Sequence, residues 1–309
     1  MHTKFRGNVC LLLTAIIWGT AFVAQKVGMD HIGPFTVQMM RSYLGALALL
    51  PVIFLLDHQK KKNGTAKSVT RAQRKTLWIG GVCCGICLTV ASCLQQFGLQ
   101  EADPGKAGFF TAMYLLFVPV CGLFFRKKPP KRIWFCIAVA VVGMYLLCCG
   151  TGRFTVTASD ILLLLCALAF TGHILVIDFF SPKTDGVKMS CIQFFLSGVL
   201  STIPALVLET PTAGAVLSAW IPLCYLGFLS SGVGYTLQIV GQKYTEPALA
   251  SLLMSFESVF SMVAGALYYR KLPTLPETIG CALLFAAILV SQFPVRTREE
   301  PIQTAPPSA

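Results

Sequence analysis

Two ionisable side chains stand inside long apolar runs of this chain, where a charge is costly. Glu257 lies near the middle of SLLMSFESVFSMVAGAL (251–267), and Arg41 lies in the apolar run 34–56. The ring of Pro247 suits a first helical turn, so a helix begun there carries Glu257 about 15 Å inward at about 1.5 Å per residue. That depth is the middle of a bilayer with a hydrocarbon core about 30 Å thick. A carboxyl so placed predicts proton transfer or a substrate contact, and a hydrogen-bonded glutamate that fixes helix packing is the alternative.

Arg41 is predicted to lie about 10 Å into its own helix by the same rise per residue. It shares one helical face with Pro34, Gln38 and Gly45. A planar guanidinium could bind an anionic group of a substrate there, or pair with a carboxylate. The alternative is that the long side chain extends to the outer interface of the membrane.

The composition indicates which medium surrounds these charges. The chain has 309 residues, of which 55% are hydrophobic and 12% are charged, whereas soluble domains carry about 25% charged residues. So few charges cannot cover a water-facing surface, and a bilayer is therefore expected. A membrane-spanning helix needs about 20 mostly apolar residues. Ten such runs can be read from the sequence, at 8–27, 34–56, 77–98, 105–125, 133–150, 159–179, 189–208, 220–241, 247–268 and 275–293.

The net charge is +12, but the placement of the basic residues argues against a nucleic-acid partner. With ten spans, most lysines and arginines fall on the side of both termini, above all in the loop 57–75 and in RKKPPKR (126–132). This is the positive-inside pattern, so both termini are predicted to be cytoplasmic in a multi-pass protein of the cell membrane. Membrane lipids with anionic headgroups are the expected neighbours of the basic loops.

The two halves of the chain resemble each other. LQQFGLQEADPGKA (94–107) aligns with LQIVGQKYTEPALA (237–250) at an offset of 143 residues, and NVCLLLTAIIWG aligns with DILLLLCALAFT at an offset of 152. Each half therefore holds five predicted spans, and the odd number makes the second half enter the membrane from the opposite side. Inverted repeats are typical of secondary transporters, whose substrate site lies near the midplane between the halves.

The repeat pairs the two charged residues with neutral partners in the other half. Tyr114 aligns with Glu257 at the first offset, and Gln193 aligns with Arg41 at the second. Matched positions of unlike chemistry could form a cavity that holds a polar substrate asymmetrically.

Four further residues are candidates for the substrate or proton pathway. Gln95 and Gln238 are a matched pair near helix ends, where interhelical hydrogen bonds explain them as well as a substrate contact does. Trp18 lies deep in the first run and could line a cavity or simply pack. Ser261 follows Glu257 by four residues and shares an adjoining face of the helix.

Four segments together resemble a known family. IIWGTAFVAQK, MMRSYLGALALLP, FFTAMYLLFVPVCGLFF and LLMSFESVFSMVAGALYYRKL, in the first, second, fourth and ninth spans, are similar to the EamA-type branch of the drug/metabolite transporter superfamily. The resemblance covers about 8–150 and 158–292. It implies ten helices, a central cavity open to one side at a time, and transport of small metabolites, often export.

The chain departs from this family at two helix ends. Family members often end the fourth and ninth helices with a Gly-Glu pair, but here those places hold Phe125-Arg126 and Tyr269-Arg270. Any role of that family glutamate therefore does not carry over to this chain.

Enzyme signatures are missing from the sequence. PGKAG (104–108) resembles part of a P-loop, but Ala107 stands where a serine or threonine would bind Mg²⁺. The sequence has no H-E-x-x-H or G-x-S-x-G motif. We expect neither enzymatic activity nor a cofactor or metal, so an ion or substrate gradient must supply the energy for transport.

These observations predict an all-α integral membrane protein with ten transmembrane helices, arranged as two inverted five-helix repeats around a central cavity. The first repeat is predicted over 8–150, the connection over 151–158, the second repeat over 159–293 and a disordered cytoplasmic tail over 294–309. The predicted function is secondary active transport, as export of a small metabolite or drug-like solute, with proton coupling through Glu257 as a hypothesis. An uncoupled facilitator and a non-transporting scaffold are the alternatives, and both a monomer and a homodimer stay open.

Overall fold

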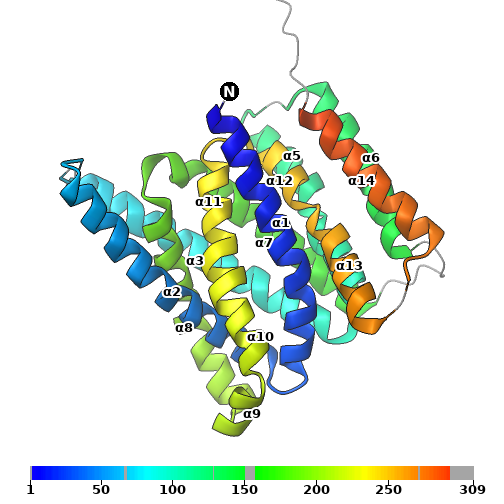
Figure 1. Ribbon diagram of the computed structural model, residues 1–309, viewed down its shortest axis with the longest axis horizontal. Helices are drawn as coiled ribbons and strands as arrows, with labels where there is room; N and C mark the ends of the chain where they lie inside the picture. Colours follow the sequence, from blue (N-terminus) through cyan, green and yellow to red (C-terminus); the bar gives the residue numbers. More distant parts are fainter. Residues whose placement is uncertain (1, 66–67, 128, 150–156, 271, 293–309) are drawn as a thin grey trace, which may run out of the picture.

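The computed structural model describes residues 2–65, 68–127, 129–149, 157–270 and 272–292, and within these ranges it contains helices and no strands (Figure 1). The α-helices are α1 (His2–Met29), α2 (Pro34–Lys62), α3 (Arg71–Glu101), α4 (Pro104–Ala112), α5 (Tyr114–Phe124), α6 (Lys131–Cys149), α7 (Ala158–Phe180), α8 (Gly186–Pro204), α9 (Ala213–Ser218), α10 (Trp220–Cys224), α11 (Thr236–Gln242), α12 (Pro247–Met254), α13 (Glu257–Tyr269) and α14 (Leu275–Gln292). A short 3₁₀ turn, η1 (Ser181–Lys183), and two π-helical segments, η2 (Ala205–Glu209) and η3 (Tyr225–Tyr235), complete the described helices. The predicted tail 294–309 and most of the predicted connection 151–158 lie outside these ranges.

Eight helical stretches are long and apolar enough to cross a bilayer. They are Phe5–Met29, Pro34–Lys62, Arg71–Glu101, Pro104–Phe124, Ala158–Lys183, Gly186–Glu209, Trp220–Gln242 and Pro247–Tyr269. The other two predicted spans fall on α6 and α14, which pack against each other at one edge of the bundle (Figure 1). The apolar part of α14, Leu275–Ser291, is shorter than these eight stretches. The prediction of an all-helical, multi-pass membrane protein is confirmed, while the number ten stays a prediction.

Local sequence explains where several helices begin. Pro104 and Pro247 are the first residues of α4 and α12, where a missing N–H costs no hydrogen bond. The predicted helix start at Pro247 is therefore confirmed. Thr70 caps α3 through a capping box with Gln73, in which each side chain accepts a hydrogen bond from the other residue's backbone N–H.

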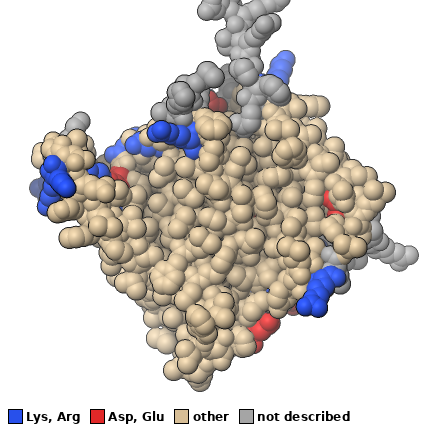
Figure 2. Space-filling model, viewed as in Figure 1, with Lys and Arg blue, Asp and Glu red and all other residues tan. Residues whose placement is uncertain are grey.

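Helices α2 and α3 are longer than a bilayer requires. Their 29 and 31 residues span about 43–46 Å at about 1.5 Å per residue, against about 30 Å of hydrocarbon. Their connected ends extend beyond the bundle on the side where α1 begins, which we call the N-terminal face (Figure 1). Basic side chains gather on these ends and along this face, above a broad band almost free of charge (Figure 2). Such a band fits contact with lipid chains.

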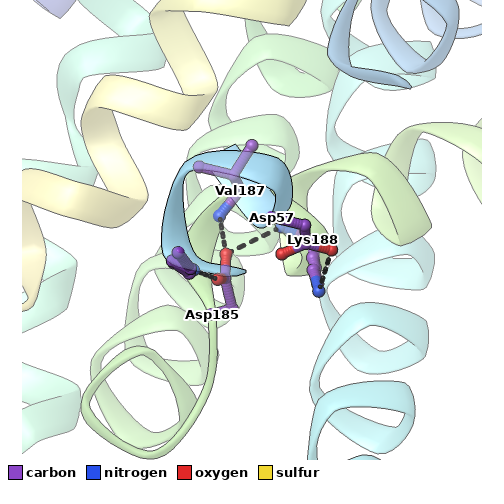
Figure 3. Close-up of polar contacts among 5 residues, drawn as sticks. Asp57, Asp185, Val187 and Lys188 are labelled. Atoms are coloured by element: carbon purple, nitrogen blue, oxygen red, sulfur yellow. Dashed lines mark hydrogen bonds and ion pairs between the residues drawn. The ribbon is translucent and has the colours of Figure 1, made fainter. Parts of the chain in front are cut away.

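Two ion pairs join the end of α2 to the start of α8. Lys60 Nζ lies 2.9 Å from a carboxylate oxygen of Asp185, and Lys188 Nζ lies 2.8 Å from one of Asp57. Asp185 also caps α8, because its carboxylate accepts the backbone N–H groups of Val187 and Lys188 at 3.1 and 3.3 Å (Figure 3). Burial alone would raise the pKa of Asp185, but the bonds from Lys60 and from the cap outweigh it and lower that pKa below its ordinary value. Asp185, which pairs with Lys60 and caps α8, is therefore charged at neutral pH.

At the opposite face, one carboxylate joins the start of α2 to η2, the π-helical segment that continues α8. Glu209 accepts hydrogen bonds from the backbone N–H groups of Phe35 and Thr36 at 2.8 and 2.7 Å, and from the Thr36 hydroxyl at 2.7 Å. A carboxylate at a helix start satisfies donors that the helix leaves free. Gly33 makes this possible, since a Cβ there would overlap the Glu209 carboxyl. Helices α2 and α8 are thus held together at both ends.

A glycine sets the spacing between α1 and α13, the helix that carries Glu257. A Cβ built on Gly19 would lie 2.6 Å from the carbonyl oxygen of Glu257 and would also overlap Phe260. We therefore expect Gly19→Ala to separate the two helices and to cost about 1–3 kcal/mol of stability, as overpacking does. Thermal unfolding of the purified protein measures this as a lower midpoint. Gly265→Ala is the matched control, because a Cβ at Gly265 meets nothing within 4 Å, and an equal loss in both variants would contradict the explanation.

Candidate functional site

The candidate site is a small cavity in the centre of the bundle. Its volume of about 20 Å³ has room for about one water molecule. Eight helices (α1–α5, α7, α11 and α13) and the π-helical segment η3 contribute its polar and aromatic lining, which consists of Trp18, Phe22, Gln25, Arg41, Gln95, Thr111, Tyr114, Phe170, Ser230, Tyr235, Gln238 and Glu257. The side chains of Arg41 and Glu257 are 4% and 2% exposed, so the cavity is closed toward both membrane faces.

Two interrupted helices bring a tyrosine and a glutamate together in this cavity. Helix α4 ends at Ala112 and α5 begins at Tyr114, while α12 ends at Met254 and α13 begins at Glu257. Tyr114 and Glu257 are therefore the first residues after each interruption. The Tyr114 hydroxyl donates to Glu257 Oε1 at 2.9 Å across 143 residues of sequence. The alignment of these two residues in the sequence thus corresponds to a direct contact in space.

The apolar runs 105–125 and 247–268 each predict one unbroken helix, whereas both helices are interrupted, and the interruptions have local causes. In α5, Pro119 cannot donate to the carbonyl of Leu115, which weakens the first turn after the break. In α12, Ser255 donates its hydroxyl to the Leu252 carbonyl at 2.8 Å. A serine that bonds back to its own helix in this way often bends that helix.

Among the residues that the structure describes, Arg41 donates hydrogen bonds to neutral side chains only. Its guanidinium donates to Ser231 Oγ at 3.2 Å, to Gln25 Oε1 at 3.1 Å and to Ser230 Oγ at 3.0 Å. None of the ion pairs in the described ranges includes it. Its side chain lies inside the bundle rather than at the membrane interface. A buried cation without an acidic partner is costly, so the cavity presents a positive charge that an anionic group would stabilise.

Aromatic rings line the same cavity as the two charged groups. The ring centroids of Trp18 and Tyr235 lie 4.4 Å apart, and Phe194 packs edge-on behind Tyr235 at 5.5 Å. Trp18 also donates its indole N–H to the Ser230 carbonyl at 3.4 Å, which orients the ring. Rigid rings of this kind give apolar contact area at a low cost in conformational entropy.

Gln95 and Gln238 also line the cavity, as members of the predicted set. Gln95 Nε2 donates to Thr111 Oγ1 at 3.4 Å. Gln238 is 1% exposed, and its buried Oε1 accepts no hydrogen bond. An acceptor left without a donor costs free energy, so a bound solute with an N–H group would gain from meeting it.

Two predicted residues lie outside the cavity. Gln193 is buried on α8, where its Oε1 lies 3.0 Å from Nε2 of His173. Ser261 donates its hydroxyl to the Pro104 carbonyl at 2.6 Å, in the contact between α13 and α4. The structure therefore brings Trp18, Arg41, Gln95, Tyr114, Gln238 and Glu257 together and places these two elsewhere.

Several lining residues are not among those predicted from the sequence. Gln25 follows Trp18 by seven residues, so helical periodicity could have found it. Ser230 and Tyr235 lie in the π-helical segment η3, whose register differs from that of an α-helix. In the part of the chain that the structure describes, no three His, Cys, Asp or Glu side chains gather closely enough to hold a metal ion.

Comparisons with known proteins show the family of this chain. The family profile described as the EamA-like transporter family matches residues 5–149 and 157–293. An uncharacterized transporter of Archaeoglobus fulgidus is 26% identical over 288 residues, covering 93% of this chain and 86% of that protein. A probable terminal-alkyne amino-acid exporter of Streptantibioticus cattleyicolor is 22% identical, with 91% of each chain covered. A probable amino-acid metabolite efflux pump of Escherichia coli is 24% identical, with 95% of this chain and 97% of that protein covered.

A solved crystal structure also shares the fold. It superposes with a TM-score of 0.73 at 15% sequence identity, over 92% of this chain and 97% of its own. The family predicted from the four sequence segments is confirmed by the family profile, as are the prediction of a transporter rather than an enzyme and the expectation of a small-molecule substrate. This chain, a multi-pass membrane transporter, belongs to the EamA-like transporter family.

Proposed function

We propose that the protein exports a small amino-acid-like metabolite by alternating access, and that Glu257 couples this export to protons. One observation carries the proposal. The central cavity holds an arginine without an acidic partner and a carboxyl on a different helix, and these two groups do not bond to each other.

These two groups complement a zwitterion. The Arg41 guanidinium would take the carboxylate of the solute, and Glu257 would take its ammonium group. Aromatic side chains between them, chiefly Trp18, Phe22 and Tyr235, would contact an apolar side chain. The names of two relatives, an amino-acid exporter and an amino-acid metabolite efflux pump, support the same class of solute.

Alternating access is supported by the repeated design of the two halves. The interruptions before Tyr114 and Glu257 occur at matched positions, 143 residues apart. Interrupted helices that meet at the midplane are a common way for transporters to build a site between inverted repeats. We propose ten helices in two such repeats, over 8–150 and 159–293.

The basic N-terminal face is proposed to be cytoplasmic in the cell membrane. Lys60, Lys61 and Lys62 end α2, and three more basic residues stand in the first turns of α3. Such an excess favours the cytoplasmic side. Protons that enter from the opposite face and bind Glu257 would then drive the solute outward.

A thermal-shift titration tests the class of solute. A ligand that binds only the folded protein raises its unfolding midpoint, and at a given ligand concentration the rise is larger for tighter binding. We expect a shift with L-amino acids that carry apolar side chains, a smaller shift with their methyl esters, which lack the carboxylate, and a smaller shift with their N-acetyl derivatives, which lack the ammonium group. Equal shifts for all three compounds, or shifts with uncharged sugars alone, would contradict a zwitterion site.

A further inference from the structure

Two larger cavities lie at opposite ends of the interrupted helices. One has a volume of about 290 Å³ and lies between α5 and the start of α12. The other has a volume of about 320 Å³ and lies between α13 and the start of α4. The first opens at the N-terminal face, because Thr245, just before α12, bonds to Asn8 near the start of α1. The second opens at the opposite face, which we call the far face.

The two cavities are lined by matched residues of the two halves. Pairs of residues, each separated by 143 residues, line them in the same way, among them Asp103 and Glu246, Pro104 and Pro247, Gly105 and Ala248, Val118 and Ser261, Pro119 and Met262, and Gly122 and Gly265. The central cavity, with Tyr114 and Glu257, lies between the two. Each outer cavity is therefore an approach to the central one from one face of the membrane.

Each approach is closed by a contact between two half-helices. At the far face, α13 packs on α4, and we call this contact the far closure. At the N-terminal face, α5 packs on α12, and we call this contact the near closure. A Cβ on Gly108 of α4 would come within 3.2 Å of Ser261 on α13, so the far closure is tightly packed.

The two closures differ in hydrogen bonding. In the far closure, Ser258 donates its hydroxyl to the Gly108 carbonyl at 3.1 Å, and Ser261 donates to the Pro104 carbonyl at 2.6 Å. Both serines are fully buried. The matched residues of the near closure are Leu115 and Val118, which have no hydroxyl group. The far closure therefore has two interhelical hydrogen bonds that its counterpart cannot form.

We propose that Ser258 and Ser261 latch the far closure, so that the empty transporter opens preferentially toward its N-terminal face. This inference rests on the alternating access proposed above. It identifies the far closure as the stronger of the two closures and gives the hydrogen bonds that make it so. Interhelical hydrogen bonds in membranes are individually modest, so two of them shift the ratio of the two open forms by about 5–10-fold. An exporter gains from this bias, because the empty site then waits on the side where its solute is made.

Hydrogen exchange on the purified full chain tests the latch. Backbone amides exchange at a rate set by how often their segment opens. We expect Ser258→Ala combined with Ser261→Ala to speed exchange by about 5–10-fold in peptides from 104–112 and 257–269, the far closure. Peptides from 114–124 and 247–254, the near closure, are expected to show no increase, because one gate is closed while the other opens.

Two further variants keep the test sharp. Ser251→Ala is the matched control, because Ser251 is equally buried but donates its hydroxyl within its own helix, to the Ala248 carbonyl at 3.0 Å. It is expected to leave both closures unchanged. Val118→Thr changes little in shape and adds a hydroxyl to the near closure, so it is expected to slow exchange in 247–254 by about threefold.

Unchanged exchange in the serine double variant, or an equal increase at both closures, would overturn the latch. The Val118→Thr variant gives an independent answer if the double variant does not fold, and faster exchange in 247–254 would count against the proposal. The outcome is separate from the class of solute, since exchange is measured on the empty protein. If amino acids give no thermal shift while the serine double variant speeds exchange at the far closure alone, the proposed solute is wrong and the latch stands.

Discussion

The Glu257→Gln substitution is expected to abolish pH-driven accumulation of solute, while transport down a gradient continues with weaker binding, because the amide no longer offers a charge to the ammonium group. Glutamine has nearly the same shape, and its Oε1 can still accept the Tyr114 hydroxyl that Glu257 accepts at 2.9 Å. It cannot carry a proton, so the carrier would cycle without coupling. With one proton exchanged per solute, a gradient of one pH unit supports about tenfold accumulation in the native protein, and the variant should show none.

Proteoliposomes with a defined pH gradient give this measurement. Tyr114→Phe is the complementary control, because it removes the hydrogen bond that Glu257→Gln keeps and retains the carboxyl that Glu257→Gln removes, so accumulation should persist. Full accumulation by Glu257→Gln would show that another group carries the proton. If the native protein equilibrates the solute at every pH gradient, the uncoupled facilitator is the better description.

The Arg41→Ala substitution is expected to weaken binding of the solute by about 10–150-fold. The estimate follows from the loss of a charged hydrogen bond, worth about 1.5–3 kcal/mol. Lysine at this position should restore little of the affinity. The guanidinium reaches Gln25, Ser230 and Ser231 at once, and a single ammonium cannot reproduce that planar arrangement of donors.

Calorimetric titration of the free amino acid and its methyl ester makes this prediction specific. The ester should bind native protein weakly, and Arg41→Ala should bind the acid and the ester about equally, because the variant and the ester each remove one partner of the same contact. Gln193→Met serves as the control, since Gln193 is buried beside His173 and outside the cavity. If Arg41→Ala binds the free amino acid with an affinity within about twofold of that of the native protein, the proposed contact between Arg41 and the carboxylate of the solute is wrong.

The agreement between sequence and structure is greatest where the signal is local. Apolar runs predicted the membrane helices, and the fixed backbone of Pro247 predicted the start of α12. The depth of Glu257 followed from the constant rise of a helix, and this residue does lie in the centre of the bundle. These properties depend on the residue itself and its neighbours along the chain, so they can be read without knowing what packs against what.

The internal repeat gave information about distant residues as well. It aligned Tyr114 with Glu257, and the two proved to share a hydrogen bond. A symmetry of the sequence constrains which parts of the halves meet, because equivalent residues of two inverted repeats approach each other near the axis that relates them.

Other features were decided by tertiary structure alone. Gln193 aligned with Arg41, yet it contacts His173, whose ring packs against Tyr235, and it does not line the cavity. Ser230 and Tyr235 reach the cavity because η3 is wound as a π-helix, which changes the direction of every side chain along it. Periodicity counts residues on an assumed helix, so it cannot foresee a change of winding or which face meets a neighbour. The sequence by itself determined the medium and the helices, whereas side-chain packing between helices decided which of the polar residues share one cavity.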